Sequence, residues 1–186
     1  MAEEARLQLI DEIIAQELEM FLAVKNRGGT ASCQEQPDSF RIMRHMTHAV
    51  MPIEYLESYL ADLKQAVADK RNLMTEKYAL MEGIIPVQND SQAISELVQI
   101  ESNWRKEVSA QFPLSVHPDG HESFCTYLNG ELQTYSPKTL IFYLNYARKT
   151  QHNGGNLVRE RYEILMRKLG YDSLTHCEES IASGKK

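Results

Sequence analysis

The chain has 186 residues and a formal charge of −6, and it contains no basic run, which argues against a nucleic-acid-binding surface. No stretch approaches the roughly 20 apolar residues of a membrane span, and the N-terminal segment MAEEARLQ is acidic where a signal peptide would be basic. We therefore expect a cytoplasmic protein without membrane contact, whose partner is a small-molecule ligand. It should fold as one helical domain over residues 1–186 with a disordered tail at 183–186.

The three cysteines, Cys33, Cys125 and Cys177, are odd in number and far apart in the sequence. None belongs to a CxxC pair, so the pattern favours reduced thiols over a disulfide framework or a zinc site. His45 and His48 are three residues apart on a predicted helix, a spacing open to metal binding, but no known metal signature surrounds them. We therefore assign no metal-binding residue, and the sequence identifies no cofactor.

Apolar residues recur every three or four positions along most of the chain, which predicts helices. The predicted helices cover residues 3–25, 37–50, 53–68, 72–83, 91–112, 136–153 and 156–169, with a further short one over about 172–182. A break near residues 69–72 is expected because the apolar stripes on either side of it are out of phase by about 100°. Asn72, Ser91 and Ser136 are the expected N-caps.

The segment CTYLNGELQTY departs from helical spacing. Its polar and apolar residues alternate around Asn129-Gly130, a dipeptide typical of two-residue hairpin turns. We therefore predict a small β-hairpin near residues 124–135. The expected fold class is all-α, an irregular bundle of about seven helices with this one hairpin.

Four ionisable side chains point toward the core when the predicted helices are drawn at 100° per residue. Lys77 shares a stripe with apolar residues of its helix, and Glu17 and Glu101 lie within the apolar stripes of theirs. Arg105 follows Glu101 by one turn, where the two can pair. A buried charge is costly unless it is paired, neutralised or used, and two acids with two bases suggest one buried network. That network is either a functional site or a structural feature. In the structural alternative the charges form ion pairs, or their long side chains extend to the protein surface.

The loop GGTASCQ, residues 28–34, precedes the predicted helix that opens near Pro37. Backbone N–H groups before a helix start can bind an anion or lower the pKa of a thiol, so Cys33 is the candidate nucleophile. A packed or exposed thiol without a role is the alternative. Further candidate substrate contacts are Gly28, Gly29, Ser32 and Gln34 in this loop and Tyr78 beside Lys77, for which half-buried packing is the alternative.

Three stretches carry a resemblance to a known family: GGTASCQ at 28–34, LESYLADL at 56–63 and NLMTEKYA at 72–79. Together they resemble an uncharacterised bacterial family catalogued as domain of unknown function 4125, most clearly over residues 8–110. The resemblance implies that polar residues concentrate in the same loop and helix in the family. It implies no reaction.

The inward charges lead to two alternative functions. The pocket is expected where the helices at 3–25, 72–83 and 91–112 meet beneath the GGTASCQ loop. The first alternative is an enzyme acting on an anionic or amino-acid-like substrate, with Lys77 and Arg105 binding its negative charge, Glu17 or Glu101 as general base, and Cys33 as nucleophile or substrate contact. The second is a noncatalytic ligand-binding or adaptor module whose inward charges only fix the helix register.

Overall fold

A computed structural model of the chain describes residues 2–25 and 32–184. Over these residues the chain forms nine α-helices, two short 3₁₀ helices and no strand. The elements in chain order are α1 (Ala2–Leu22), η1 (Ser32–Glu35), α2 (Pro37–Ala49), α3 (Ile53–Ala68), α4 (Leu73–Met81), α5 (Gln92–Gln111), η2 (Pro118–Gly120), α6 (His121–Leu132), α7 (Pro137–His152), α8 (Leu157–Lys168) and α9 (Leu174–Ala182). The all-α fold class is therefore confirmed.

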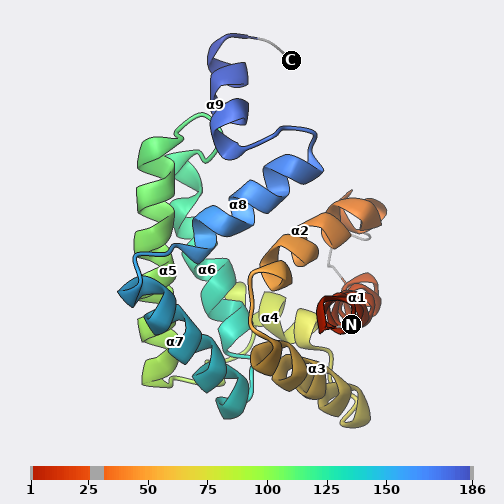
Figure 1. Cartoon of the computed structure of the whole chain (residues 1–186). Helices are drawn as coiled ribbons and strands as arrows, with labels where there is room; N and C mark the ends of the chain where they lie inside the picture. The colour runs from red at the N-terminus through yellow and green to blue at the C-terminus, as the bar shows by residue number, and fades with distance from the viewer. Residues whose placement is uncertain (1, 26–31, 185–186) are drawn as a thin grey trace.

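The helices form two groups that pack against each other (Figure 1). In the first group α1 packs against α2, α3 and α4, and in the second α5 packs against α6, α7 and α8. Contacts of α2 with α8, α3 with α7, and α4 with α6 join the two groups. The short helix α9 packs on α8 and projects from one end of the bundle (Figure 1).

The predicted helix starts agree with local capping chemistry. Asn72 Oδ1 accepts the backbone N–H of Thr75 at 2.9 Å at the start of α4. Ser91 and Ser136 cap α5 and α7 in the same manner, so all three expected N-caps are confirmed. The predicted break between α3 and α4 is also present: Lys70 has a φ of 57°, a left-handed conformation that ends a helix.

The predicted β-hairpin is wrong, because residues 121–132 form α6. Gly130 lies inside this helix, buried against α4, and not in a turn. A Cβ atom on Gly130 would lie 2.8 Å from Met81 Cγ and 3.2 Å from the Lys77 carbonyl oxygen. The glycine therefore permits a close approach of two helices, a use that the local pattern Asn129-Gly130 does not distinguish from a turn. With α6 and α9 included, the helices number nine over the described residues and not about seven.

Ser183 and Gly184 close α9 with a turn, and residues 185–186 of the predicted tail lie outside the described residues. Within the part of the chain that the structure covers, every helix is too short or too polar to cross a membrane.

Candidate functional site

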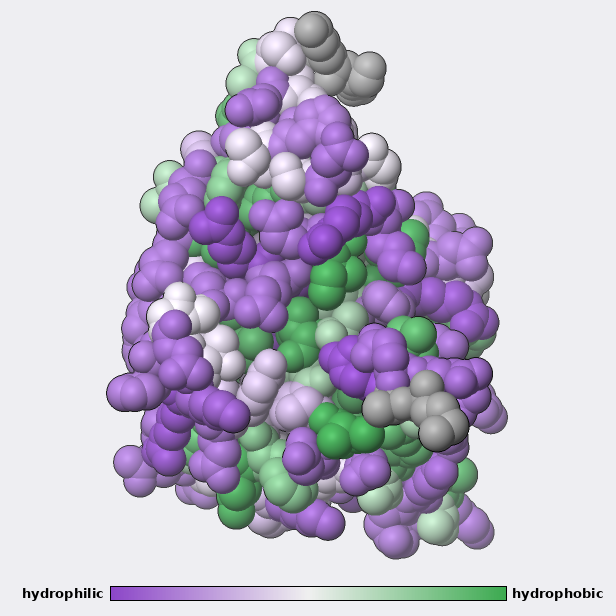
Figure 2. All heavy atoms as spheres, in the orientation of Figure 1, coloured by the Kyte–Doolittle hydropathy of each residue, from purple (hydrophilic) through white to green (hydrophobic). Residues whose placement is uncertain are grey.

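A cavity of about 490 Å³ lies at the junction of the two helix groups, walled mainly by α2, α4, α6 and α8. Much of its wall is apolar or aromatic, including Met43, Met46, Met74, Phe124 and Leu128. Figure 2 shows hydrophobic side chains gathered in the middle of one face of the molecule, with hydrophilic side chains around them. The predicted position of the pocket was wrong in part: α4 and α5 contribute lining residues, but the cavity faces α2, α6 and α8 and not α1.

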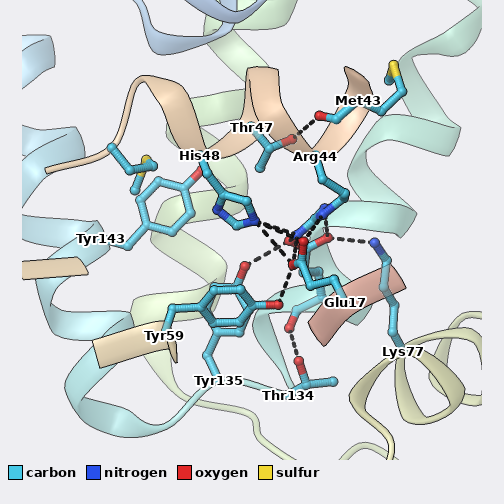
Figure 3. A network of polar contacts seen from close by, with 12 residues as sticks. Glu17, Met43, Arg44, Thr47, His48, Tyr59, Lys77, Thr134, Tyr135 and Tyr143 are labelled. Carbon is cyan, nitrogen blue, oxygen red and sulfur yellow. Dashed lines mark hydrogen bonds and ion pairs between the residues drawn. The ribbon is translucent and has the colours of Figure 1, made fainter. Parts of the chain in front are cut away.

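Glu17 of α1 is fully buried and enclosed by hydrogen-bond donors (Figure 3). Arg44 of α2 binds it through both Nε–Oε2, at 2.8 Å, and Nη2–Oε1, at 2.5 Å. Tyr59 donates its hydroxyl to Oε1 at 2.7 Å, and His48 Nε2 lies 3.1 Å from Oε2. Burial by itself would raise the pKa of Glu17, but the charge and hydrogen bonds of Arg44 and His48 outweigh it and lower the pKa to about 2. A carboxylate held this way is a weak base.

Glu131 of α6 is the partner of Lys77. Lys77 Nζ donates to Glu131 Oε2 at 2.5 Å, and Tyr135 donates to Oε1 at 2.8 Å. Arg44 also reaches Glu131, with Nη2 at 2.9 Å from Oε1, so its guanidinium joins two carboxylates. Burial opposes ionisation of Glu131, yet Arg44 and Lys77 hold the pKa well below its usual range. Lys77, Arg44 and Glu131 all line the cavity.

Glu101 of α5 belongs to a separate cluster with Arg161 of α8 and Tyr143 of α7. Arg161 Nη1 donates to Glu101 Oε2 at 2.6 Å, and Tyr143 donates to Oε1 at 2.6 Å. Burial disfavours the charged guanidinium, but Glu101 and Tyr143 outweigh it and raise the pKa of Arg161. Glu101 itself is fully buried and does not line the cavity, whereas Arg161 and Tyr143 do.

Arg105 of α5 lines the cavity with an incompletely bonded guanidinium. The residue is 5% exposed, and Nη2 donates to the His117 carbonyl oxygen at 3.0 Å. Nε and Nη1 are buried without a hydrogen-bond partner among the described residues. The guanidinium carbon lies 5.6 Å from the centre of the Phe124 ring. Gly120 leaves room for this position, since a Cβ there would lie 2.7 Å from Nη2.

The charges around the cavity do not balance. Four cations line its wall: Arg44, Lys77, Arg105 and Arg161. Three carboxylates lie on the wall or bind one of these cations from behind it: Glu17, Glu101 and Glu131. Every one of these carboxylates is bound by a cation. Within the described ranges Arg105 has no carboxylate within ion-pair distance, so one positive charge is left over at the cavity wall.

The four predicted inward charges are therefore all buried, but they do not form one network. Lys77 pairs with Glu131, Glu101 pairs with Arg161 and not with Arg105, and Glu17 pairs with Arg44. The partners come from other helices, so the expected pairing among the four was wrong. The burial of each group follows from its own helix, whereas its partner depends on which helices meet.

Of the other predicted contacts that the structure describes, Tyr78 lies at the cavity and Gln34 does not. Tyr78 lines the cavity, and its ring centre lies 6.3 Å from that of Tyr127. Gln34 is buried away from the cavity and donates to the carbonyl oxygen of Phe21 at 2.9 Å. Gly28 and Gly29 lie outside the described residues, as do the side chains of Ser32 and Cys33. Within the described part of the chain, no group of three His, Cys, Asp or Glu side chains is placed to hold a metal ion.

Sequence reasoning missed three charged residues of these clusters that line the cavity. Glu131 was hidden by the hairpin prediction, although as a helical residue it lies one turn from Leu128, which lines the same cavity. Arg161 follows Leu157 and Val158 by one turn of α8, a buried position that its helical spacing indicates. Arg44 lies one turn from His48 beside the apolar face of α2, and nothing in its own helix indicates that α1 and α6 cover it.

Comparison with known proteins gives one match. A family model described as Protein of unknown function (DUF4125) matches residues 7–179, a longer stretch than residues 8–110, where the sequence motifs carry the resemblance most clearly. No curated protein and no solved structure in the comparisons matches the chain significantly. Because the family match spans most of the chain and includes the helices that wall the cavity, the chain belongs to the DUF4125 family.

Proposed function

We propose that the protein binds a small, largely apolar molecule with a single negative charge in the central cavity, and that Arg105 is the anchor for that charge. The observation that carries the proposal is the guanidinium of Arg105, buried at the cavity wall with Nε and Nη1 unbonded. Leaving such donors unsatisfied costs about 1–3 kcal/mol or more for a charged group. A carboxylate or similar anion bound beside this guanidinium would supply it with a counter-charge and an acceptor, and guanidinium groups bind carboxylates with matching geometry.

The rest of the wall favours an apolar ligand body. Methionine and aromatic side chains make up much of the lining, and methionine adapts to irregular ligand shapes. The polar groups of the wall are mostly engaged: Arg44 and Arg161 already bind buried carboxylates. A ligand with several charges would therefore find only one unpaired counter-charge. A cytoplasmic location is part of the proposal and is compatible with the free thiols of Cys125 and Cys177.

Turnover of the bound anion is a second candidate function, favoured by one observation. Lys77 and Glu131 form an ion pair at the cavity wall, where a bound molecule would contact them. Glu17 and Glu101 are less suited to act as bases, because cations hold both carboxylates away from the cavity. In this candidate Lys77 donates a hydrogen bond or a proton to the substrate. The proposed role of Cys33 as nucleophile rests on its loop position alone.

Binding is tested by titrating the protein with apolar monoanions such as 1-anilinonaphthalene-8-sulfonate and decanoate, by fluorescence and calorimetry. We expect saturable binding at one site, weakened at least tenfold by Arg105→Met. The free protein should not lose stability in this variant, since the substitution removes an incompletely bonded buried charge. Arg148→Met is the matched control, because Arg148 pairs with Glu96 on the exposed surface. Equal affinity of the Arg105→Met variant and the wild type would exclude the anchor role.

A further inference from the structure

We infer, on the basis of the proposed function, that the ligand is elongated and has two different ends: a carboxylate at Arg105 and a neutral hydroxyl at the Lys77–Glu131 pair, joined by an apolar segment along α6. The cavity presents two kinds of polar end. At Arg105 a positive charge is unpaired, whereas at Lys77 the charge is already paired with Glu131 at 2.5 Å. The two ends therefore select different chemical groups.

One face of α6 connects these two ends. Gly120, the N-cap of α6, is followed by Phe124, Leu128 and Glu131 of α6 at intervals of three or four residues, and all four line the cavity. The Arg105 guanidinium lies against the first part of this face, at Gly120 and Phe124. Thus α6 acts as the floor on which an extended ligand would lie.

Lys77 lies against the last part of the same face. Its Nζ is 5.2 Å from the centre of the Tyr127 ring and 2.5 Å from Glu131 Oε2. Arg105 therefore lies midway between Gly120 and Phe124, near residue 122, and Lys77 lies midway between Tyr127 and Glu131, near residue 129. At the helical rise of 1.5 Å per residue, these two levels along α6 are about 10 Å apart. An extended chain gains about 1.2 Å per bond, so about eight bonds cover this distance.

The side chains between the two ends are apolar on the α6 floor. Phe124 and Leu128 line this interval, and Met74 of α4 also lines the cavity. An aliphatic or aryl-alkyl segment would bury apolar surface there, which favours binding. A second charged group along this floor would lose its hydration without finding a partner.

Charge decides the group at the far end. A second anion would be repelled by Glu131, and a cation would be repelled by Lys77 and Arg44, which both bind that carboxylate. A neutral hydroxyl is repelled by neither. Its oxygen can accept a further N–H of the Lys77 ammonium, which has three donors, whereas Glu131 already accepts hydrogen bonds from Arg44, Lys77 and Tyr135 on both oxygens. The class of ligand that fits is therefore a monocarboxylate of medium chain length with a terminal hydroxyl.

The test is a calorimetric series on the wild-type protein with ω-hydroxycarboxylates of about six to twelve carbons, each compared with the unsubstituted acid and with the dicarboxylate of the same length. We expect the hydroxyl to tighten binding by about tenfold at an intermediate length near eight to ten carbons, and less at either extreme, since a hydrogen bond to a charged group is worth about that factor. The dicarboxylate should bind more weakly than the hydroxy acid.

A variant locates the gain at Lys77. In Lys77→Met the hydroxy acid and the plain acid should bind equally, while both still depend on Arg105. If carboxylates bind through Arg105 but no chain length gains from a terminal hydroxyl, or if the dicarboxylate binds as tightly as the hydroxy acid, the two-ended ligand is wrong and the proposed anion site stands. If no monoanion binds the wild type, the proposed function itself fails. The wild-type series decides between these results even if the variant does not fold.

Discussion

Replacing Arg44 by methionine should destabilise the protein strongly, and more at neutral than at acidic pH. Arg44 is buried and joins the carboxylates of Glu17 and Glu131, so its removal leaves two buried acids short of donors. Breaking a buried ion pair by removing one partner costs roughly 3–5 kcal/mol. The apolar stem of methionine keeps most of the packing, so the loss is mainly electrostatic.

The pH dependence follows from Glu17. Its pKa is lowered from 4.5 to about 2 in the folded protein, a difference that corresponds to about 3 kcal/mol of stability. Because the folded pKa is below the unfolded one, this stability is present above about pH 5 and is lost as the pH falls toward 2. Without Arg44 a main cause of the lowered pKa of Glu17 is gone while burial still raises it, so the folded pKa moves upward and less stability is lost on acidification. The difference in stability between wild type and variant should therefore narrow on acidification.

Urea unfolding followed by circular dichroism, at several pH values from 7 to 3, measures this difference. Arg148→Met is the control, because its exposed pair with Glu96 should contribute little. If Arg44→Met is not folded at pH 7, Arg44→Lys keeps the charge but not the paired hydrogen bonds and should show a smaller loss. A wild-type-to-variant difference that stays constant from pH 7 to pH 3 would refute the assignment of the low pKa to Arg44.

Two glycine substitutions test the close contacts around the cavity. Gly120 has an ordinary backbone conformation, with φ at −76°, so Gly120→Ala should leave the free energy of unfolding nearly unchanged. The added Cβ should displace the Arg105 guanidinium and weaken monoanion binding. Unchanged affinity by calorimetry would contradict this positioning role of Gly120. Gly130→Ala places a Cβ 2.8 Å from Met81 Cγ. The overpacking should lower the free energy of unfolding, measured with urea, by about 1–3 kcal/mol. An unchanged free energy of unfolding would mean that α4 and α6 move apart easily.

Helix positions and helix ends were largely predictable from the sequence. The stripes of apolar residues and the caps at Asn72, Ser91 and Ser136 act within one or two turns, so a single segment contains all the information they need. The same holds for the burial of Lys77, because the direction of a side chain on a helix follows from its place in the stripe. The hairpin prediction was wrong because the dipeptide Asn129-Gly130 suits a two-residue turn but also a close contact between two helices, which is its use here.

The sequence by itself therefore determined an all-α chain and the inward direction of Glu17, Lys77, Glu101 and Arg105. Only the tertiary structure decided their partners, since Glu131 and Arg161 lie more than fifty residues away from Lys77 and Glu101. It also decided which charge remains unpaired. Each helix specifies which of its faces is buried, but the packing of α2, α4, α6 and α8 determines what that face meets, and so leaves the Arg105 guanidinium at the cavity wall without a carboxylate among the described residues.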